Sequence, residues 1–194
     1  MKSVLISIQP KWCELIASGK KTIEVRKTRT KIKTPFKCYI YCTKGKHEML
    51  WRWKNEVFYD TQDPYNRPNQ MAGKVIGEFV CDKITPIRKS ISGFVVEGGI
   101  AVTNEMAVNS CLDYSDMIKY FGDKKLGYGW RISNLKIYDT PKELGEFKVK
   151  CKEQKHGECL LTSCGINEPY FHTCAEGGYK PLNKPPQSWF YVEV

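Results

Sequence analysis

The sequence predicts a mixed α+β protein, a small β-barrel with a few short helices. Short segments in which apolar and polar residues alternate recur along the chain, which is typical of half-buried strands. One early helical segment lies among them, and a strict alternation of strands and helices is absent. The 194 residues, 41% hydrophobic and 27% charged, are enough for one globular domain with its own core.

The first predicted elements are a strand, a helix and a second strand. Residues 3–8 alternate and predict a strand, after which Pro10 occupies a suitable first helical position. Gly19 stands where that helix would end. Residues 21–26 alternate again, so we expect a strand whose two apolar residues, Ile23 and Val25, face inward.

The polar residues of this second strand form a separate face. Thr22, Glu24 and Arg26 share it, because side chains on a strand repeat every two residues. Lys21 would lie on the opposite, inward face if the strand began there. It can join these residues only if the turn at Gly19 redirects it.

The remaining elements follow from the same patterns. Further strands are predicted at 37–42, 74–82, 130–132, 135–138 and 189–192, and a helix at 115–121. Residues 43–72 are polar and aromatic and contain Pro64 and Pro68, which predicts a long loop or insertion.

Charge points to a polyanionic partner. The net charge is +10, from 31 Lys and Arg against 21 Asp and Glu, which favours nucleic acid first and an acidic membrane surface second. A merely soluble basic protein is the alternative. The sequence has no run of 18 apolar residues and no secretory signal, so we expect a cytoplasmic protein that does not cross a membrane.

The basic residues are densest between positions 20 and 37, where eight cations face a single carboxylate. Three of them alternate and would point one way in an extended segment, like a row of phosphate contacts. The alternative is a solvated loop without a partner. The candidate nucleic-acid contacts are Lys20, Lys21, Arg26, Lys27, Arg29, Lys31 and Lys33.

Aromatic residues alternate with cations between positions 50 and 67. Such rings could stack on unpaired bases, and Trp53 and Tyr65 are the candidates for that role. They could equally form a small apolar cluster that anchors a long loop.

The segment Gly19-Lys20-Lys21-Thr22-Ile23-Glu24-Val25-Arg26 resembles the signature of the ASCH domain, whose members are similar to the RNA-associated PUA barrels. Four further stretches resemble ASCH proteins of bacteria and phages, namely residues 7–10, 74–79, 127–133 and 185–189. The resemblance implies a PUA-like domain made of residues 1–147 and 185–194, with insertions at 43–72 and 148–184.

The resemblance also implies a cleft floored by Lys21, Glu24 and Arg26, and hence binding of RNA or of a modified nucleoside. Physically, the two cations can hold a phosphate or a carbonyl, and the carboxylate can accept from an exocyclic amine. The alternatives are a structural ion-pair network and a hydrolase, acting on a nucleobase amide or on the RNA backbone.

One ASCH-like subgroup hydrolyses acetylcytidine with a lysine, a threonine and a glutamate, and Glu24 stands here in the threonine's place. A carboxylate at that position would have to activate water rather than attack. Glu78 is the candidate second carboxylate, because it lies in mid-strand between apolar neighbours. A salt bridge from Glu78 to Arg26 is the alternative.

Four of the nine cysteines lie within 24 residues near the C-terminus, together with two histidines. The odd total and the missing secretion signal argue against a disulfide framework. Four such ligands could hold one structural zinc, although no Cys-x-x-Cys pair occurs. The candidate ligands are Cys151, Cys159, Cys164 and Cys174, with His156 or His172 as alternates. Unliganded thiols, a redox pair, or a segment that docks a protein partner are the other interpretations.

Overall fold

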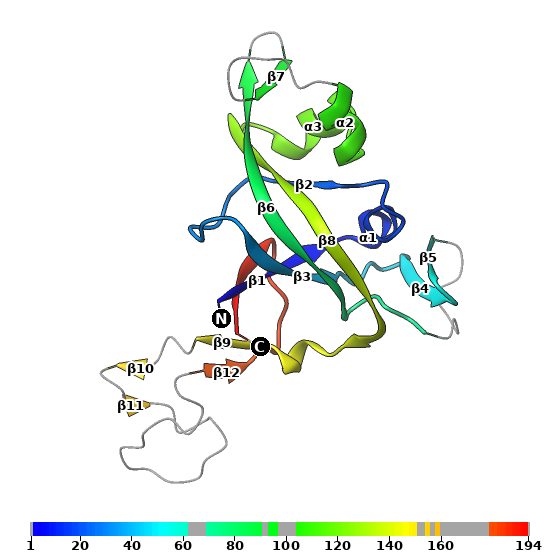
Figure 1. The fold of residues 1–194 in the computed structure, drawn as a ribbon, viewed down its shortest axis with the longest axis vertical. Coiled ribbons are helices and arrows are strands. Elements are labelled where there is room, and N and C mark those ends of the chain that lie inside the picture. Colours follow the sequence, from blue (N-terminus) through cyan, green and yellow to red (C-terminus); the bar gives the residue numbers. More distant parts are fainter. Residues whose placement is uncertain are drawn as a thin grey trace.

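A seven-stranded sheet, built from the described residues, forms the centre of the molecule (Figure 1). The structure is a computed structural model that describes residues 2–61, 69–90, 93–96, 104–150, 154–155, 158–159 and 179–193. The strands of the sheet are β1 (Ser3–Ile8), β2 (Ile23–Arg26), β3 (Phe36–Cys42), β6 (Val75–Ser90), β7 (Gly93–Val96), β8 (Leu126–Lys142) and β13 (Trp189–Val192). Their order is β13-β1-β3-β6-β8-β2, and β7 pairs with β6.

The sheet is mixed, which confirms the predicted α+β class. Strands β1 and β3 are parallel, whereas β1–β13, β3–β6, β6–β8 and β2–β8 are antiparallel. Strand β1 is buried on both faces, because Val4 and Ile6 lie in the main core and Leu5 lies in a second apolar cluster with Tyr39 and Phe147.

Two long strands run through the molecule from one end to the other (Figure 1). Strand β6 has 16 residues and β8 has 17, so the separate short strands predicted at 130–132 and 135–138 are parts of one element. Register shifts at three places along the β6–β8 pair interrupt the regular alternation, as β-bulges do. This irregularity explains why the pattern alone divided β8 into two.

The helices are short, and the longest of those described have eight residues. They are α1 (Pro10–Ala17), α2 (Asn104–Ser110) and α3 (Tyr114–Phe121), with a 3₁₀ turn at Leu144–Glu146. The Asp113 side chain caps α3 by accepting from the Asp116 backbone N–H at 2.7 Å. No helix of the described ranges is long and apolar enough to cross a membrane.

The segment predicted as a loop at 43–72 contains a β-hairpin. Its strands are β4 (Met49–Trp53) and β5 (Glu56–Asp60), and the hairpin packs against α1. Leu50 and Met71 are fully buried in the main core, which gives this polar segment an apolar anchor. The sequence did not predict this hairpin because the segment is polar in composition. A small number of buried residues is enough to hold it against the core.

The two faces of strand β2 pack against different parts of the protein. Glu24 lies opposite the buried Trp130 of β8, and opposed residues of an antiparallel pair project to the same face. Glu24 and Arg26 therefore face the side of the main core. Ile23 and Val25, predicted to face inward, pack into a separate hydrophobic cluster with residues of β6, β7, α2 and α3.

The two ends of the strand order approach each other through side chains. The Trp189 indole Nε1 of β13 donates to the hydroxyl of Thr28, two residues after β2, at 3.0 Å. The Thr30 hydroxyl and the Lys31 backbone N–H both donate to the Tyr191 hydroxyl, each at 3.0 Å. The basic loop, which we define as residues 27–35, is therefore anchored to the last strand of the sheet.

Part of the predicted insertion at 148–184 is joined to the domain at both ends. Strand β9 (Lys148–Lys150) pairs with β12 (Tyr179–Pro181), and Leu182 is buried in the second apolar cluster. A two-residue pair, β10 (Gln154–Lys155) with β11 (Glu158–Cys159), lies between them.

Candidate functional site

A left-handed turn places Lys21 beside the strand that follows it. Gly19 has φ +75°, a conformation that glycine adopts at low cost, and it ends the turn after α1. The Lys21 backbone N–H then donates to the Leu15 carbonyl at 2.9 Å. Strand β2 begins only at Ile23, so Lys21 is free of its alternation and points toward Glu24.

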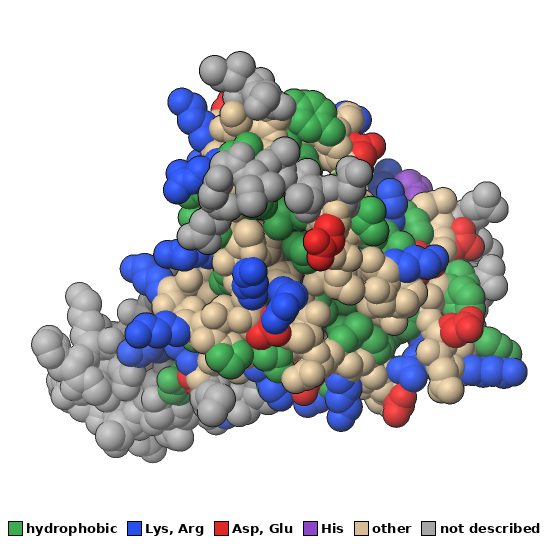
Figure 2. All heavy atoms as spheres, turned by 45° about the horizontal axis from the view of Figure 1, so that its top comes forward, with side chains coloured by type: hydrophobic (Ala, Val, Ile, Leu, Met, Phe, Trp, Pro, Cys, Tyr) green, Lys and Arg blue, Asp and Glu red, His purple; other side chains and the backbone are tan. Residues whose placement is uncertain are grey.

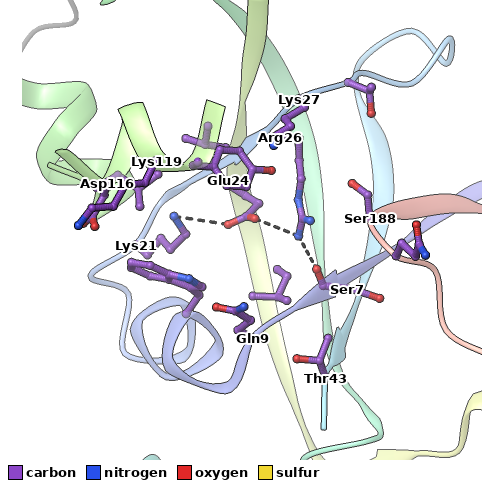
Figure 3. Close-up of a pocket in the computed structure, with 17 residues that line it drawn as sticks. Ser7, Gln9, Lys21, Glu24, Arg26, Lys27, Thr43, Asp116, Lys119 and Ser188 are labelled. Carbon is purple, nitrogen blue, oxygen red and sulfur yellow. Dashed lines mark hydrogen bonds and ion pairs between the residues drawn. The ribbon is translucent and has the colours of Figure 1, made fainter. Parts of the chain in front are cut away.

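Lys21, Glu24 and Arg26, which we call the charged trio, form one ion-pair network (Figure 3). The Glu24 carboxylate lies 3.4 Å from the Lys21 Nζ and 3.0 Å from an Arg26 Nη2 atom. The side chains are 2% exposed for Lys21 and 9% for the other two. Burial of three charges is costly unless each one has partners, and these three supply them to one another.

Backbone carbonyls complete the network. The Lys21 ammonium donates to the Ser110 carbonyl at the end of α2, and Arg26 donates to the Ser7 carbonyl of β1. The Arg26 Nε is buried without a hydrogen-bond partner among the described residues. The trio thus connects β2 to α2 on one side and to β1 on the other.

The trio lines a cavity of about 850 Å³, which we call the motif cavity. Its volume lies within the range of about 300–1,000 Å³ that is typical of small-molecule sites. Its walls come from β1, α1, β2, α3 and the approach to β13. Besides the trio, its polar lining residues are Ser7, Gln9, Trp12, Lys27, Thr28, Thr43, Asp116, Lys119, Tyr120, Gln187 and Ser188.

Two neighbouring groups are held in their neutral forms. Burial raises the pKa of the Tyr120 phenol, although the nearby Arg26 guanidinium partly offsets this effect. Tyr120 is therefore a hydrogen-bond donor at the cavity wall near neutral pH. Burial and the adjacent Cys42 thiol raise the pKa of Cys13 well above its usual range, so Cys13 is an inert thiol rather than a nucleophile.

The structure brings only part of the predicted basic contact to the cavity. Lys27 lines it, with its ammonium 5.2 Å from the centre of the Tyr120 ring. Lys20, Arg29, Lys31 and Lys33 are exposed outside the lining. Figure 2 shows Lys and Arg side chains spread widely over one face of the molecule, in keeping with the net charge of +10.

Of the two aromatic candidates, only Trp53 is described, and it does not line the motif cavity. Trp53 is 58% exposed at the end of β4, and Tyr65 lies outside the described residues. Trp51 stacks on Phe58 across the hairpin, with ring centres 5.7 Å apart. This pair corresponds to the interpretation that the aromatic residues anchor the segment.

The position of Glu78 differs from both interpretations of it. Its carboxylate accepts from the Lys37 ammonium at 2.9 Å and from the Tyr138 hydroxyl at 2.7 Å. Glu78 does not line the motif cavity, and Arg26 pairs with Glu24 instead. The alternation of β6 places Glu78 on the side of the strand away from Phe79 and the main core.

The metal prediction falls almost wholly outside the described residues. Cys151, Cys164, Cys174, His156 and His172 are not described, and of Cys159 only the backbone is. The described part of the chain contains no group of three or more His, Cys, Asp or Glu side chains that could hold a metal ion.

Most of the cavity lining was not anticipated from the sequence, and three of these residues come from one helix. Asp116, Lys119 and Tyr120 form a wall contributed by α3. The helical pattern at 115–121 predicts their helix, but nothing in that pattern indicates what its polar face meets. Only the packing of α3 over β2, through Phe121 and Val25, makes them part of the cavity.

Comparisons with known proteins give one family. The family model described as "ASCH domain" matches residues 6–156, and no curated protein matches the chain. The crystal structure of ASCH from Zymomonas mobilis is similar, with 15% identity, 98% of this chain and 87% of that chain covered, and a TM-score of 0.51.

Two mutant forms of the same Zymomonas mobilis protein give closely similar results. One covers 100% of this chain and 91% of that chain, at 16% identity and a TM-score of 0.53. The other covers 98% of this chain and 88% of that chain, at 15% identity and a TM-score of 0.50. At these identities the likeness concerns the fold alone. Because the family model spans well over half of the sequence, this chain belongs to the ASCH domain family.

Proposed function

We propose that this protein binds RNA or a modified nucleoside in the motif cavity, through Lys21, Glu24 and Arg26. The family has a PUA-like fold and is associated with RNA binding. The observation that carries the proposal is that three almost fully buried charges line the wall of a cavity of about 850 Å³. An ion-pair network with a purely structural role does not require such a space.

The trio offers the chemistry that a nucleobase edge requires. Arg26 has more N–H groups than its two hydrogen-bonded partners use, and Lys21 has three donors in total. A carbonyl or phosphate oxygen can accept from these groups, while an exocyclic amine can donate to Glu24. The basic loop adds exposed cations beside the cavity, suited to the flanking phosphates of a strand.

A hydrolase is the second candidate, because a second carboxylate lines the same cavity. Asp116 of α3 and Glu24 of β2 both face it, together with the Lys21 ammonium. Two carboxylates and a cation can activate water and stabilise the charge that develops on a carbonyl or phosphate. In such a reaction Asp116, rather than Glu78, would be the second carboxylate.

The test measures binding and product together. Labelled single-stranded and structured RNA is incubated with wild type, Lys21→Met and Arg26→Met at two salt concentrations. We expect both variants to lose roughly tenfold or more in affinity, because hydrogen bonds to charged groups contribute about 1.5–3 kcal/mol each. Lys74→Ala, which removes the Lys74–Glu143 pair outside the cavity, is the matched control and should bind normally.

Thermal unfolding of each variant separates lost binding from lost folding. Equal RNA affinity for folded wild type and folded Arg26→Met would overturn the proposal. Formation of a product by wild type, and its loss in Glu24→Gln and Asp116→Asn, would establish the hydrolase instead.

The predictions for residues 148–184 remain separate from this site. A structural zinc held by its cysteines, and docking of a protein partner, both stay predictions of the sequence. Neither depends on the charged trio, so variants of the trio should leave them unchanged.

A further inference from the structure

The motif cavity contains more positive than negative charge. Four cationic side chains line it, Lys21, Arg26, Lys27 and Lys119, against two carboxylates, Glu24 and Asp116. Glu24 is engaged by the two buried cations. Within the described part of the chain, neither Lys27 nor Lys119 forms an ion pair with a carboxylate. The lining therefore carries a net charge of +2, to which the charged trio contributes +1 and the group of Lys27, Lys119 and Asp116 contributes +1.

The two unpaired lysines come from different elements and approach one part of the cavity. Lys27 directly follows β2, and its ammonium lies over the ring of Tyr120. Lys119 precedes Tyr120 in α3. In the view of Figure 3 both lie on the upper side of the cavity, whereas Ser7 and Thr43 lie on its lower side.

Both lysines are also available to a ligand. Lys27 and Lys119 are exposed, in contrast to the buried Lys21 and Arg26. The cavity thus has an inner part, where charges are already hydrogen-bonded to protein, and an outer part. In the outer part, Lys27 and Lys119 form no ion pair among the described residues and share the lining with the carboxylate of Asp116. A ligand that fits both parts needs a polar body and an anionic end.

We propose that the motif cavity binds a nucleoside monophosphate, with the phosphomonoester between Lys27 and Lys119 and the nucleoside toward the charged trio. This inference rests on the proposed function and names its ligand class. A phosphomonoester carries about −1.5 to −2 charges near pH 7, which matches the net charge of +2 of the whole cavity lining. A nucleoside carries none, and an internal phosphodiester carries one.

A free mononucleotide and the phosphorylated end of an RNA share this chemistry. Both present a ribose with a terminal phosphate, and the open outer part of the cavity does not distinguish them. The experiment therefore includes both sources, as the 5′- and 3′-monophosphates of the four common ribonucleosides and as short RNAs with 5′-phosphate or 5′-hydroxyl ends.

Calorimetry or fluorescence would measure the affinity of each monophosphate and of its parent nucleoside for wild type, Lys27→Gln and Lys119→Gln. Wild type should bind the preferred monophosphate at least about tenfold more tightly than its nucleoside, and each variant should lose most of that advantage. Lys124→Gln is the control, because it removes an equal charge from an exposed lysine that does not line the cavity.

The outcomes separate the two proposals. Equal affinity for nucleoside and monophosphate, or an advantage that survives both substitutions, overturns the phosphate site and leaves the proposed function standing if Arg26→Met abolishes binding. Binding of none of the nucleosides, nucleotides or RNAs overturns this inference and also overturns the RNA-binding part of the proposed function. A preference for 5′-phosphorylated RNA over free nucleotides would identify the strand end as the source.

Discussion

The Glu24 carboxylate lies between a lysine ammonium and an arginine guanidinium, and all three side chains are removed from solvent. Neither cation has another carboxylate within reach among the described residues. Glu24 is therefore the group that keeps two buried positive charges compatible with folding, whatever ligand the cavity binds.

We expect Glu24→Gln to lower the free energy of unfolding by about 3–5 kcal/mol, because it leaves two buried cations uncompensated. Urea denaturation followed by circular dichroism measures this change. Asp139→Asn, which breaks the Arg52 pair at a carboxylate that is 93% exposed, should change stability little. Equal effects of the two substitutions would show that the trio is not a stabilising network.

At this scale the sequence predicted a good part of the site. The two-residue period of β2 placed Glu24 and Arg26 on one face, and Gly19 supplied the turn that Lys21 needed. The partners of Glu78 could not be predicted in the same way. A charge in mid-strand indicates a polar partner, but the partner proved to be Lys37 with Tyr138, and strand parity alone does not name it.

Among the described elements outside the sheet, α3 contributes the most residues to the cavity lining. It is fixed by the contact of Phe121 with β8, where the neighbouring residue is Gly127. A Cβ at Gly127 would lie 1.9 Å from the Phe121 ring, closer than any side chain allows. The absence of a side chain there is what lets α3 approach.

We expect Gly127→Ala to destabilise the fold by about 1–3 kcal/mol, since the buried Phe121 ring must move. The displacement of α3 should also weaken ligand binding at the cavity, because Lys119 and Asp116 move with it. Thermal unfolding and the binding assay measure both effects. Gly145→Ala, where nothing lies within 4 Å of the new Cβ, is the control. Normal binding by a destabilised Gly127→Ala would separate α3 from the site.

Elements with strong periodicity were predicted well, and those held by few contacts were not. The strand at 3–8 and the helices at Pro10 and at 115–121 occur where the pattern places them. The sequence pattern did not predict the hairpin β4–β5. Its attachment to the main core depends on Leu50 and on Met71, which is distant from the hairpin in sequence. Helix α2 likewise has no clear apolar stripe.

At the scale of the whole molecule, an ion pair between the long strands β6 and β8 makes a small contribution to stability that depends on pH. Asp82 and Arg131 form a two-point ion pair, with distances of 2.6 and 2.7 Å, beside the register shift between Cys81 and Ile84. The hydrogen bond from Arg131 lowers the pKa of Asp82 from 3.8 to about 2. The ionised carboxylate therefore favours the folded state.

Because the pKa is lower in the folded state, this stabilisation is present above about pH 4 and is lost as the pH falls toward 2. Solvent weakens the pair, since the Arg131 side chain is 56% exposed, so the effect is a small part of the total stability. Urea midpoints of wild type and Asp82→Asn should differ at pH 5 and converge near pH 2. A difference that stays constant over this range would contradict the assignment.

Ser7 joins parts of the chain that are far apart in sequence. Its hydroxyl donates to the Pro186 carbonyl, 179 residues away in sequence. Its backbone N–H donates to the Ser188 carbonyl, and its own carbonyl accepts from Arg26. At about 5–20 residues per second, a ribosome needs on the order of 10–40 s to synthesise the intervening chain. A nascent chain therefore displays its basic loop long before its pocket is complete, in a setting crowded with messenger and ribosomal RNA. The cavity wall formed by Gln187 and Ser188 is complete only after the C-terminal end of the chain has been made.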